Sequence, residues 1–437
     1  MELKPVEECC MVKIAVYVTG CSLNQALGEM LKARFGNILV EDLDAADIVI
    51  LNLCAVKKPT EDRGIALARR LIRAGKKVII TGCLAESDPA RIAKLVRSAH
   101  LISIQHLFEV PIDGLIREIE TAEEPIIRTG LKLSIQYPSK RIIENPLIGI
   151  IPIAFGCTNN CTYCIDKRIW GTVRSIPLDL VVEEVKRLIK QGAKEIRITA
   201  HDTAAYGIDI GTDLVELLEK ILKIEGEFMI RIGMASPNTF SRIADRLLPL
   251  MKEEERIYKF VHIPVQSGSD RILRLMNRPY TVDEYRELFF GVRRVLGPDS
   301  TIATDIIVAF PTESEEDHKA TIRLLEELKP DVVNISRYGD RPGCPSTRLR
   351  PKIHSKIAKQ RSYEISQIVR TISLEQNRKF VGRVLKVLFL EKRGASLGRA
   401  PNNRIVYVDQ EVELGRFYYT KILQATWKSL YGIIEPT

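Results

Sequence analysis

Short apolar segments alternate with longer amphipathic segments over the first hundred residues. The short segments are rich in β-branched residues, as strands are, whereas the longer ones place apolar residues at helical spacing. The expected strands are residues 12–18, 47–53 and 77–82, and the expected helices are residues 23–35, residues 59–74 and a run that begins at residue 89. Pro59 suits the first turn of a helix, and Gly75 suits a C-terminal cap. This alternation predicts a small α/β domain with a parallel sheet.

A second series of strand–helix units begins at residue 147. Its expected strands are residues 147–154, 195–200, 229–234, 260–265, 301–310 and 331–337. Amphipathic runs such as residues 178–190 and 314–328 separate them. Units of this number predict an open, partial (β/α)6 barrel rather than a closed barrel of eight units.

The C-terminal part of the chain changes to short strands with glycine turns. The expected strands are residues 380–390, 405–407, 417–419 and 422–426, and Gly394, Gly398 and Gly415 lie between or beside them. This pattern predicts a small all-β barrel of the oligonucleotide-binding kind. The predicted domains are residues 10–122, a connector at 123–146, a central domain at 147–376 and a C-terminal domain at 377–437.

Charge is distributed unevenly over the 437 residues. The formal net charge is +9, and residues 351–437 contain 16 basic and 7 acidic residues, whereas residues 1–350 contain 49 of each. A basic C-terminal domain indicates a polyanionic partner such as nucleic acid, although a solvated basic face would give the same count. No apolar run approaches the roughly 18 residues of a membrane span, and the N-terminus has no signal-peptide pattern. We therefore expect a cytoplasmic protein without membrane contact, in which thiols stay reduced.

Three cysteines stand close together after the first strand of the central domain. Cys157, Cys161 and Cys164 have C-x3-C-x2-C spacing and follow an apolar, β-like segment. One loop can thus present three thiolates to a [4Fe–4S] cluster, which normally takes four ligands, so one iron stays open for a substrate or cofactor. A structural zinc site would need a fourth ligand nearby. Disulfides are less favoured, because the nine cysteines are an odd number and nothing marks export.

A second cysteine triad follows the three strands of the N-terminal domain. Cys21, Cys54 and Cys83 each stand where an expected strand ends. The ends of parallel strands share one sheet edge, so three thiolates distant in sequence can meet there and hold a second cluster. Buried structural cysteines would be the alternative. Cys9, Cys10 and Cys344 receive no role.

Longer motifs around these cysteines resemble one enzyme family, the radical S-adenosylmethionine methylthiotransferases. The matching segments are residues 18–24, 51–56, 81–85, 199–207, 262–269 and 304–311, and the C-terminal domain is similar to the TRAM domain, a small RNA-binding barrel. The resemblance implies two [4Fe–4S] clusters and S-adenosylmethionine as cofactors. The cluster of the barrel would cleave this cofactor to make a radical, and that of the N-terminal domain would carry the methylthio group. The chemistry would belong to the cofactors, so no side chain is assigned a catalytic role.

The resemblance also suggests which residues bind the cofactor. The expected residues line the barrel mouth: Asp202, Tyr206, Gln266, Ser267, Ile307 and Val308. Ile307 and Val308 fit a role in the barrel core equally well.

The resemblance further suggests a substrate. Residues 164–171 and the Asp202-Thr203 pair are most similar to the archaeal and eukaryotic enzymes that act on N6-threonylcarbamoyladenosine at position 37 of tRNA. The alternatives are an isopentenyladenosine tRNA methylthiotransferase, a ribosomal-protein aspartate methylthiotransferase, and a non-enzymatic RNA-binding iron–sulfur redox sensor. No motif identifies the electron donor or the sulfur source, and we expect a monomer.

Contacts with the tRNA anticodon arm are expected from the basic C-terminal domain. The candidate phosphate ligands are Arg383, Lys386, Lys392, Arg393, Arg399 and Arg404. Tyr407 and Trp427 are possible stacking platforms for bases, or alternatively core residues.

Overall fold

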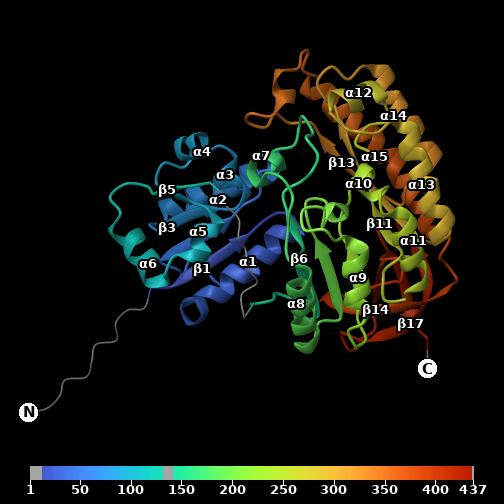
Figure 1. The fold of residues 1–437 in the computed structure, drawn as a ribbon, viewed down its shortest axis with the longest axis horizontal. Coiled ribbons are helices and arrows are strands. Elements are labelled where there is room, and N and C mark those ends of the chain that lie inside the picture. The colour runs from blue at the N-terminus through green and yellow to red at the C-terminus, as the bar shows by residue number, and fades with distance from the viewer. Residues whose placement is uncertain (1–11, 131–140, 436–437) are drawn as a thin grey trace, which may run out of the picture. The chain divides into compact units, whose positions relative to one another are not determined.

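The computed structural model describes residues 12–130 and 141–435. Its contacts divide the chain into two compact units, residues 1–144 and 145–437 (Figure 1). Cys9, Cys10 and part of the expected connector lie outside the described residues. No helix of the described segments is long and apolar enough to cross a membrane.

The first unit is built around a parallel sheet with the strand order β1-β2-β3-β4-β5. Its strands are β1 (Ile14–Val18), β2 (Ile48–Asn52), β3 (Lys77–Thr81), β4 (His100–Ile102) and β5 (Ile127–Arg128). Its helices are α1 (Ser22–Phe35), α2 (Lys58–Arg73), α3 (Cys83–Ser87), α4 (Pro89–Leu95), α5 (Ile104–Glu109) and α6 (Ile112–Thr121). The three predicted strands are confirmed, whereas β4 and β5 were not predicted, and β5 lies in the expected connector.

Both faces of this sheet are buried, as a parallel sheet requires. One face packs its alternate residues, including Ile48 and Ile50, against apolar side chains of α1, α5 and α6. On the other face, α2 packs so closely that a Cβ atom on Gly64 would lie 2.8 Å from the Leu53 side chain. Loops form the carboxyl edge of the sheet, and these loops contain the N-terminal cysteine triad.

The second unit contains six parallel strands in the described residues, as predicted. They are β6 (Ile148–Pro152), β9 (Glu195–Thr199), β10 (Met229–Ile232), β11 (Phe260–His262), β12 (Thr301–Val308) and β13 (Val332–Arg337). They form two three-stranded sheets, which backbone bonds from Tyr258 N to Ile230 O (3.0 Å) and from Ala235 N to His262 O (3.0 Å) join between β10 and β11. The strands therefore make a partial barrel with its loops at the carboxyl end.

Helices cover the outside of the partial barrel (Figure 1). The helices of the second unit are α7 (Asp166–Trp170), α8 (Leu178–Lys190), α9 (Leu214–Leu222), α10 (Pro237–Phe240), α11 (Ala244–Glu253), α12 (Asp270–Leu275), α13 (Val282–Leu296), α14 (Glu315–Leu328) and α15 (Ser355–Arg378). The short strands β7 (Ala154–Phe155) and β8 (Arg174–Ser175) pair with each other across the cysteine loop. The long helix α15 was not predicted; it follows the last barrel strand and leads into the C-terminal domain.

The C-terminal domain is a closed β barrel, as predicted. Its strands are β14 (Val384–Arg393), β15 (Ala395–Arg399), β16 (Ile405–Val408), β17 (Phe417–Ala425) and β18 (Leu430–Ile434). β17 is one continuous strand where two were predicted, and β15 and β18 were not predicted. A bulge between Ile422 and Gln424 bends β17, which explains why its sequence pattern is broken there.

This small barrel docks on the amino-terminal ends of the partial-barrel strands. Lys259, just before β11, donates its N–H to Pro401 O (2.9 Å), and Asn402 Nδ2 donates to Asp299 O (2.8 Å) just before β12. In Figure 1, β14 and β17 accordingly lie at the lower end of this unit. The carboxyl ends of the strands, where α/β barrels place their chemistry, stay clear of it.

Candidate cluster sites and barrel lumen

The loop with Cys157, Cys161 and Cys164 begins at a glycine that no other residue could replace without strain. Gly156 has φ +76°, and a Cβ atom there would lie 2.1 Å from the carbonyl oxygen of Thr172. The loop is then held at several points: Lys167 Nζ donates to Cys157 O (2.6 Å), and Thr162 Oγ1 donates to Leu275 O (2.7 Å). The turn and these bonds set the positions of the three thiols.

The three thiols influence one another electrostatically. Burial, with smaller contributions from Asp202 and Cys161, raises the pKa of Cys157 to about 11. Burial also raises the pKa of Cys164, and Asp166, Cys161 and Cys157 add to this effect. Thiolates this close need a bound cation to stay deprotonated, and iron supplies that charge. The donor set therefore fits a cluster held by three cysteines.

Arg278 contacts the cysteine loop and was not predicted from the sequence. Its Nη1 atom donates to Cys161 Sγ (3.2 Å), its Nε donates to Tyr280 OH (2.7 Å), and its Nη2 donates to Pro264 O (3.3 Å). It is 9% exposed, so its charge acts on the sulfur with little screening by water. Because 117 positions separate Arg278 from Cys161, no local pattern could reveal the contact.

Four of the six residues expected to bind the cofactor are almost completely buried: Asp202, Tyr206, Ser267 and Val308 are 0–2% exposed. Asp202 accepts hydrogen bonds from Ser236 N (3.1 Å) and Thr239 Oγ1 (2.8 Å), so its carboxylate holds the turn after β10. Tyr206 donates to Ile176 O (2.9 Å) and lies in the core. This placement corrects the expectation for Tyr206, because an aromatic side chain there is needed for packing.

Gln266 and Ile307 are the two expected residues that keep partly exposed side chains. Gln266 has φ +74°, and its backbone bridges to β12, with Gln266 N donating to Asp305 O (2.8 Å) and Ile307 N donating to Gln266 O (3.0 Å). The left-handed turn keeps both residues at the barrel mouth. They are the better candidates for contact with a bound cofactor.

The cysteines of the N-terminal triad follow three neighbouring strands. Val18 on β1 pairs with Asn52 on β2, which pairs with Thr81 on β3, and a cysteine comes two or three residues after each of these positions. Cys54 and Cys83 are buried, and Cys21 is exposed. The strand ends thus bring the three cysteines to one sheet edge.

Two glycines make room at that edge. A Cβ atom on Gly20 would lie 2.8 Å from Cys54 Cβ, and one on Gly82 would lie 2.1 Å from Asn52 Oδ1; both have positive φ, +119° and +72°. Cys54 Sγ accepts a hydrogen bond from Val56 N (3.4 Å), and Cys83 Sγ lies 3.9 Å from Asn24 Oδ1. Backbone N–H groups and amides around thiols are a suitable environment for an iron–sulfur cluster. This donor set therefore fits a cluster as well.

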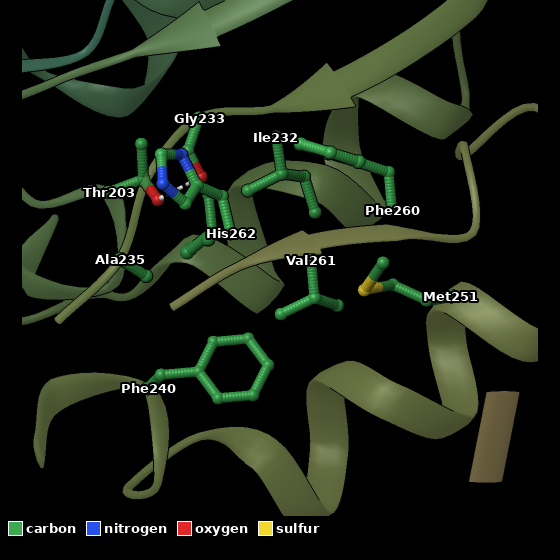
Figure 2. Close-up of a pocket in the computed structure, with 10 residues that line it drawn as sticks. Thr203, Ile232, Gly233, Ala235, Phe240, Met251, Phe260, Val261 and His262 are labelled. Atoms are coloured by element: carbon green, nitrogen blue, oxygen red, sulfur yellow. Dashed lines mark hydrogen bonds between the residues drawn. The ribbon is translucent and has the colours of Figure 1, made fainter. Parts of the chain in front are cut away.

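A polar row crosses the inner face of the partial barrel. His262 on β11 and Asn334 on β13 both bond to Asp305 Oδ1 on β12, through Nε2 (2.9 Å) and Nδ2 (2.7 Å). Figure 2 shows a cavity that His262 helps to line together with mainly apolar side chains, and Thr203 donates to Gly233 O (3.3 Å) at its edge. Its volume is about 10 Å³, room for at most one water molecule. It is a packing gap and is too small for a cofactor.

The C-terminal barrel uses some of its expected RNA ligands in other ways. Arg404 is 7% exposed and pairs with Asp331 and Asn377, so we correct its expected role from RNA contact to docking of the barrel. Arg383 pairs with Asp299 (2.5 Å) beside the same junction but is half exposed.

The other four expected phosphate ligands lie on the surface of the barrel, but each already contacts another residue of the barrel. Lys392 and Arg393 are exposed and pair with Glu411 (2.9 Å) and Glu391 (2.7 Å). Lys386 lies over the ring of Phe417, and Arg399 donates to Asn403 O (3.2 Å). These exposed ion pairs exchange easily for phosphate contacts, since such pairs contribute little in water.

Aromatic side chains lie on the outer face of the same barrel. Tyr407 stacks on Tyr431 with ring centroids 5.4 Å apart, and Trp427 is 39% exposed. Tyr419, which was not predicted, is 57% exposed and pairs in register with Lys386. An exposed aromatic next to a lysine is typical of surfaces that bind single-stranded RNA.

Two family models match the chain. The Radical SAM superfamily matches residues 151–325, and an uncharacterized protein family, UPF0004, matches residues 13–103. The first covers the partial barrel with its cysteine loop, and the second covers the sheet with the strand-end cysteines.

Similar proteins were found in archaea and vertebrates. A Pyrococcus horikoshii protein named "Probable threonylcarbamoyladenosine tRNA methylthiotransferase" is 39% identical, over 86% of this chain and 88% of the relative. A Xenopus laevis protein named threonylcarbamoyladenosine tRNA methylthiotransferase is 32% identical, over 94% of this chain and 75% of the relative. Among solved structures, the radical S-adenosylmethionine methyltransferase TsrM from Kitasatospora setae has a TM-score of 0.55 over 77% of each chain. At 13% identity, that likeness concerns the fold alone.

Proposed function

The chain belongs to the threonylcarbamoyladenosine tRNA methylthiotransferases, a radical S-adenosylmethionine family, and from this premise we propose its substrate, its second cluster and its RNA contacts. It transfers a methylthio group to C2 of N6-threonylcarbamoyladenosine at position 37 of tRNA. The product is 2-methylthio-N6-threonylcarbamoyladenosine. The enzyme acts as a monomer in the cytoplasm and holds the anticodon arm.

The observation that carries this proposal is the second cysteine triad. A radical S-adenosylmethionine enzyme uses that cofactor and one [4Fe–4S] cluster, for which the loop of Cys157, Cys161 and Cys164 suffices. Three further cysteines at the edge of a separate sheet have no use in that step. A second cluster with an open iron, held by Cys21, Cys54 and Cys83, gives them one, because the sulfur to be transferred needs a carrier.

When bound, the clusters and S-adenosylmethionine would supply the radical that removes hydrogen from an unactivated carbon and would carry the sulfur, with the electron delivered by an external donor. The side chains position these groups. Arg278 donates to Cys161 Sγ and balances charge at the cysteine loop, and Lys167 holds that loop in its turn. Ile307 packs against the same apolar cluster as Tyr163 of the cysteine loop, and Gln266 is bonded to Ile307 through its backbone carbonyl. The packed residues Asp202 and Tyr206 keep the neighbouring turns rigid.

Contacts with RNA fall to the outer face of the C-terminal barrel. The proposed residues are Lys386, Lys392, Arg393, Arg399 and Arg383 for phosphates, with Tyr407, Tyr419 and Trp427 for bases. Affinity for the anticodon arm should fall steeply with salt, with a log–log slope of roughly −0.7 to −0.9 for each phosphate contacted.

Mass spectrometry of tRNA nucleosides from cells with and without the protein tests the substrate. Loss of 2-methylthio-N6-threonylcarbamoyladenosine, restored by the gene, is the expected result. Loss of the isopentenyl counterpart would overturn the assignment within the family. Unchanged tRNA together with a ribosomal protein that lacks its methylthio group would overturn the RNA substrate. Unchanged nucleosides and ribosomal proteins, with no 5′-deoxyadenosine formed in vitro, would favour a redox sensor.

A further inference from the structure

Helix α15 begins beside the cysteine loop of the partial barrel. The segment that leads into the helix contacts that loop, since Ser346 N donates to Thr162 O (3.0 Å). In the second turn of the helix, Arg361 Nη1 donates to Glu313 O (3.1 Å), and Glu313 follows β12. Both contacts lie at the carboxyl ends of the barrel strands, so the N-terminus of α15 is at the mouth of the partial barrel.

The same helix ends at the C-terminal barrel. Ser373 Oγ donates to Asp331 O (2.9 Å) just before β13 begins, at the amino-terminal ends of the strands. One turn later, Asn377 Nδ2 donates to Thr426 O (2.7 Å) in the loop between β17 and β18. The 24 residues of α15 are about 36 Å long. They therefore run from the mouth of the partial barrel to the domain for which we propose RNA contacts.

One exposed stripe of α15 carries positive charge and aromatic surface. The stripe consists of Lys356, Lys359, Tyr363 and Arg370, all of which are exposed. Their spacing places them on one face of the helix, away from the buried side chain of Ile365. Tyr363 is 66% exposed, although a tyrosine usually buries most of its ring. At 1.5 Å per residue, this α15 stripe is about 21 Å long.

The two acidic residues of α15 do not neutralise the stripe. Glu364 pairs with His318 (3.0 Å), and Glu375 pairs with Lys329 (3.5 Å), so both carboxylates lie on the flank that faces α14. The two lysines of the stripe have no side-chain hydrogen bond and no ion pair within residues 12–130 and 141–435. Their charges are therefore available to a partner.

The same lysines lie at the end of the helix that gains least from a positive charge. The N-terminus of a helix carries a partial positive charge, which acidic residues stabilise and basic residues oppose. The first turn of α15 has no acidic residue, and Lys356 and Lys359 lie within its first two turns. The lysines and the helix end together give this side of the barrel mouth a positive potential, which attracts an anion.

At the other end of the stripe, an indole ring lies against two cations. Trp427 is 39% exposed, and its ring centroid is 5.0 Å from the guanidinium of Arg370 and 4.5 Å from Nζ of Lys428. Exposed aromatic rings with basic residues beside them are typical of surfaces that bind single-stranded nucleic acid. Because Trp427 belongs to the C-terminal barrel, the stripe continues the RNA-binding surface that we propose there.

We propose that the α15 stripe binds the anticodon arm of tRNA and directs it from the C-terminal barrel to the mouth of the partial barrel. Resting on the proposed function, this inference adds the path of the RNA. The C-terminal barrel docks at one end of the strands and the cysteine loop lies at the other, so RNA held by the first has to follow the outside of the partial barrel to reach the second. Lys356, Lys359 and Arg370 contact phosphates, and the exposed ring of Tyr363 stacks on a base. Aromatic residues between the charges favour RNA over an acidic protein as the partner.

The test measures RNA affinity in the triple variant Lys356→Gln, Lys359→Gln, Arg370→Gln and in Tyr363→Ala. An anticodon stem-loop with plain adenosine at position 37 is titrated against the reconstituted full chain at several salt concentrations. The triple variant should bind roughly ten- to hundredfold more weakly, and its log–log salt slope should fall by about two, since each lost phosphate contact removes about 0.7–0.9. Tyr363→Ala should weaken binding roughly tenfold and keep the slope, because stacking releases no counterions.

The matched control removes the same kinds of charge from other helices of the second unit. Lys223, Lys252 and Arg294 are exposed, form no ion pair in the described segments, and stand at or near the C-terminal ends of α9, α11 and α13. Their joint replacement by glutamine should change RNA affinity less than twofold. All variants should still form 5′-deoxyadenosine from S-adenosylmethionine without RNA, since none of these residues contacts the cysteine loop.

Equal losses in the triple variant and the control would show that net charge alone governs binding and would overturn the proposal. Wild-type affinity in both the triple variant and Tyr363→Ala would overturn it as well. If the triple variant bound RNA normally but was reduced more slowly by an acidic flavoprotein, and not by dithionite, the stripe would be the site of a protein partner instead. The proposed function has a separate readout, because the wild type either does or does not add a methylthio group to RNA with N6-threonylcarbamoyladenosine.

Discussion

The two cysteine triads bring three thiols together by different routes. The barrel triad lies within eight consecutive residues, so one loop and one glycine turn decide its geometry. The N-terminal triad spans residues 21–83 and exists only because β1, β2 and β3 are neighbours in a parallel sheet. The loop can therefore be damaged by local changes alone, whereas the sheet edge depends on the whole unit being folded. The barrel triad also has a cation beside it, because Arg278 Nη1 donates to Cys161 Sγ (3.2 Å).

Removing the triads one at a time gives the largest expected effects. Cys157, Cys161 and Cys164 replaced by alanine should abolish formation of 5′-deoxyadenosine and leave about four irons per chain. The same replacement of Cys21, Cys54 and Cys83 should also leave about four irons, but 5′-deoxyadenosine should still form while methylthio transfer is lost. Iron analysis measures the number of clusters, and chromatography of the products measures 5′-deoxyadenosine and methylthio transfer.

The matched control is Cys344→Ala, since Cys344 is buried, 1% exposed, and belongs to neither triad. It should keep about eight irons. A wild-type protein that never exceeds four irons after anaerobic reconstitution would contradict the two-cluster proposal.

The next largest effects are expected from glycine substitutions, each of which should disturb only one of the two cysteine triads. Gly82→Ala forces a methyl group against Asn52, which is fully buried, and should lower the iron content of the N-terminal site. Gly156→Ala forces one against the Thr172 carbonyl and should lower that of the barrel site. Each should cost several kcal/mol, because steric overlap adds to the roughly 1–2 kcal/mol of a left-handed L-residue.

Gly75→Ala is the control, because Gly75 has φ +80° but nothing within 4 Å of its added methyl group. It should cost only about 1–2 kcal/mol in a denaturant titration and leave both iron sites loaded. Equal losses in Gly75→Ala and Gly82→Ala would show that backbone conformation, and not the close approach to Asn52, governs the sheet edge.

Arg278 should distinguish the clusters electrochemically. Arg278→Gln removes a positive charge and an N–H donor from Cys161 Sγ, so the reduction potential of the barrel cluster should fall by on the order of 50 mV. The potential of the N-terminal cluster should not change. Spectroscopic redox titration of each single-triad variant gives the two potentials separately, and an equal shift in both would refute a local effect.

The smallest expected effect concerns how folding stability depends on pH. One carboxyl group in each unit should change stability in opposite directions as the pH falls. Burial alone would raise the pKa of Asp317, but hydrogen bonds from Arg271, Ser269 and Ser314 hold it well below its usual value. Its contribution to stability is therefore present above about pH 4 and is lost as the pH falls further. In the first unit, burial raises the pKa of Glu29 despite its pair with Arg141, so its contribution is lost as the pH rises above about 4.5.

Thermal unfolding between pH 3 and 6 measures this difference. Asp317→Asn should reduce the loss of stability on acidification, and Glu29→Gln should increase it, each by about 2–4 °C, the shift that 1 kcal/mol produces in a domain of this size. Changes of the same sign in both variants would contradict the directions of the two pKa shifts.

The sequence by itself determined the features that depend on local pattern. Strand–helix alternation requires parallel strands, so the ends after which Cys21, Cys54 and Cys83 stand had to share one edge. The C-x3-C-x2-C spacing lies within one loop and needs no knowledge of the fold. Glycine turns between short strands likewise indicated the C-terminal barrel. The strands β4 and β5 escaped prediction because they have only three and two residues and form where a neighbouring edge already offers hydrogen-bond partners, whereas β15 and β18 each contain a glycine that interrupts the apolar pattern of a strand.

The tertiary structure alone decided which side chains meet across long separations. Arg278 reaches Cys161, Arg404 is buried against Asp331, and Tyr206 turns into the core, although each looks in sequence like any other arginine or tyrosine. Asp202 likewise meets Thr239 only because packing brings their two turns together. Whether a polar group is solvated, paired or left alone depends on the groups that packing brings to it, and the free energy of a buried charge is set by those neighbours.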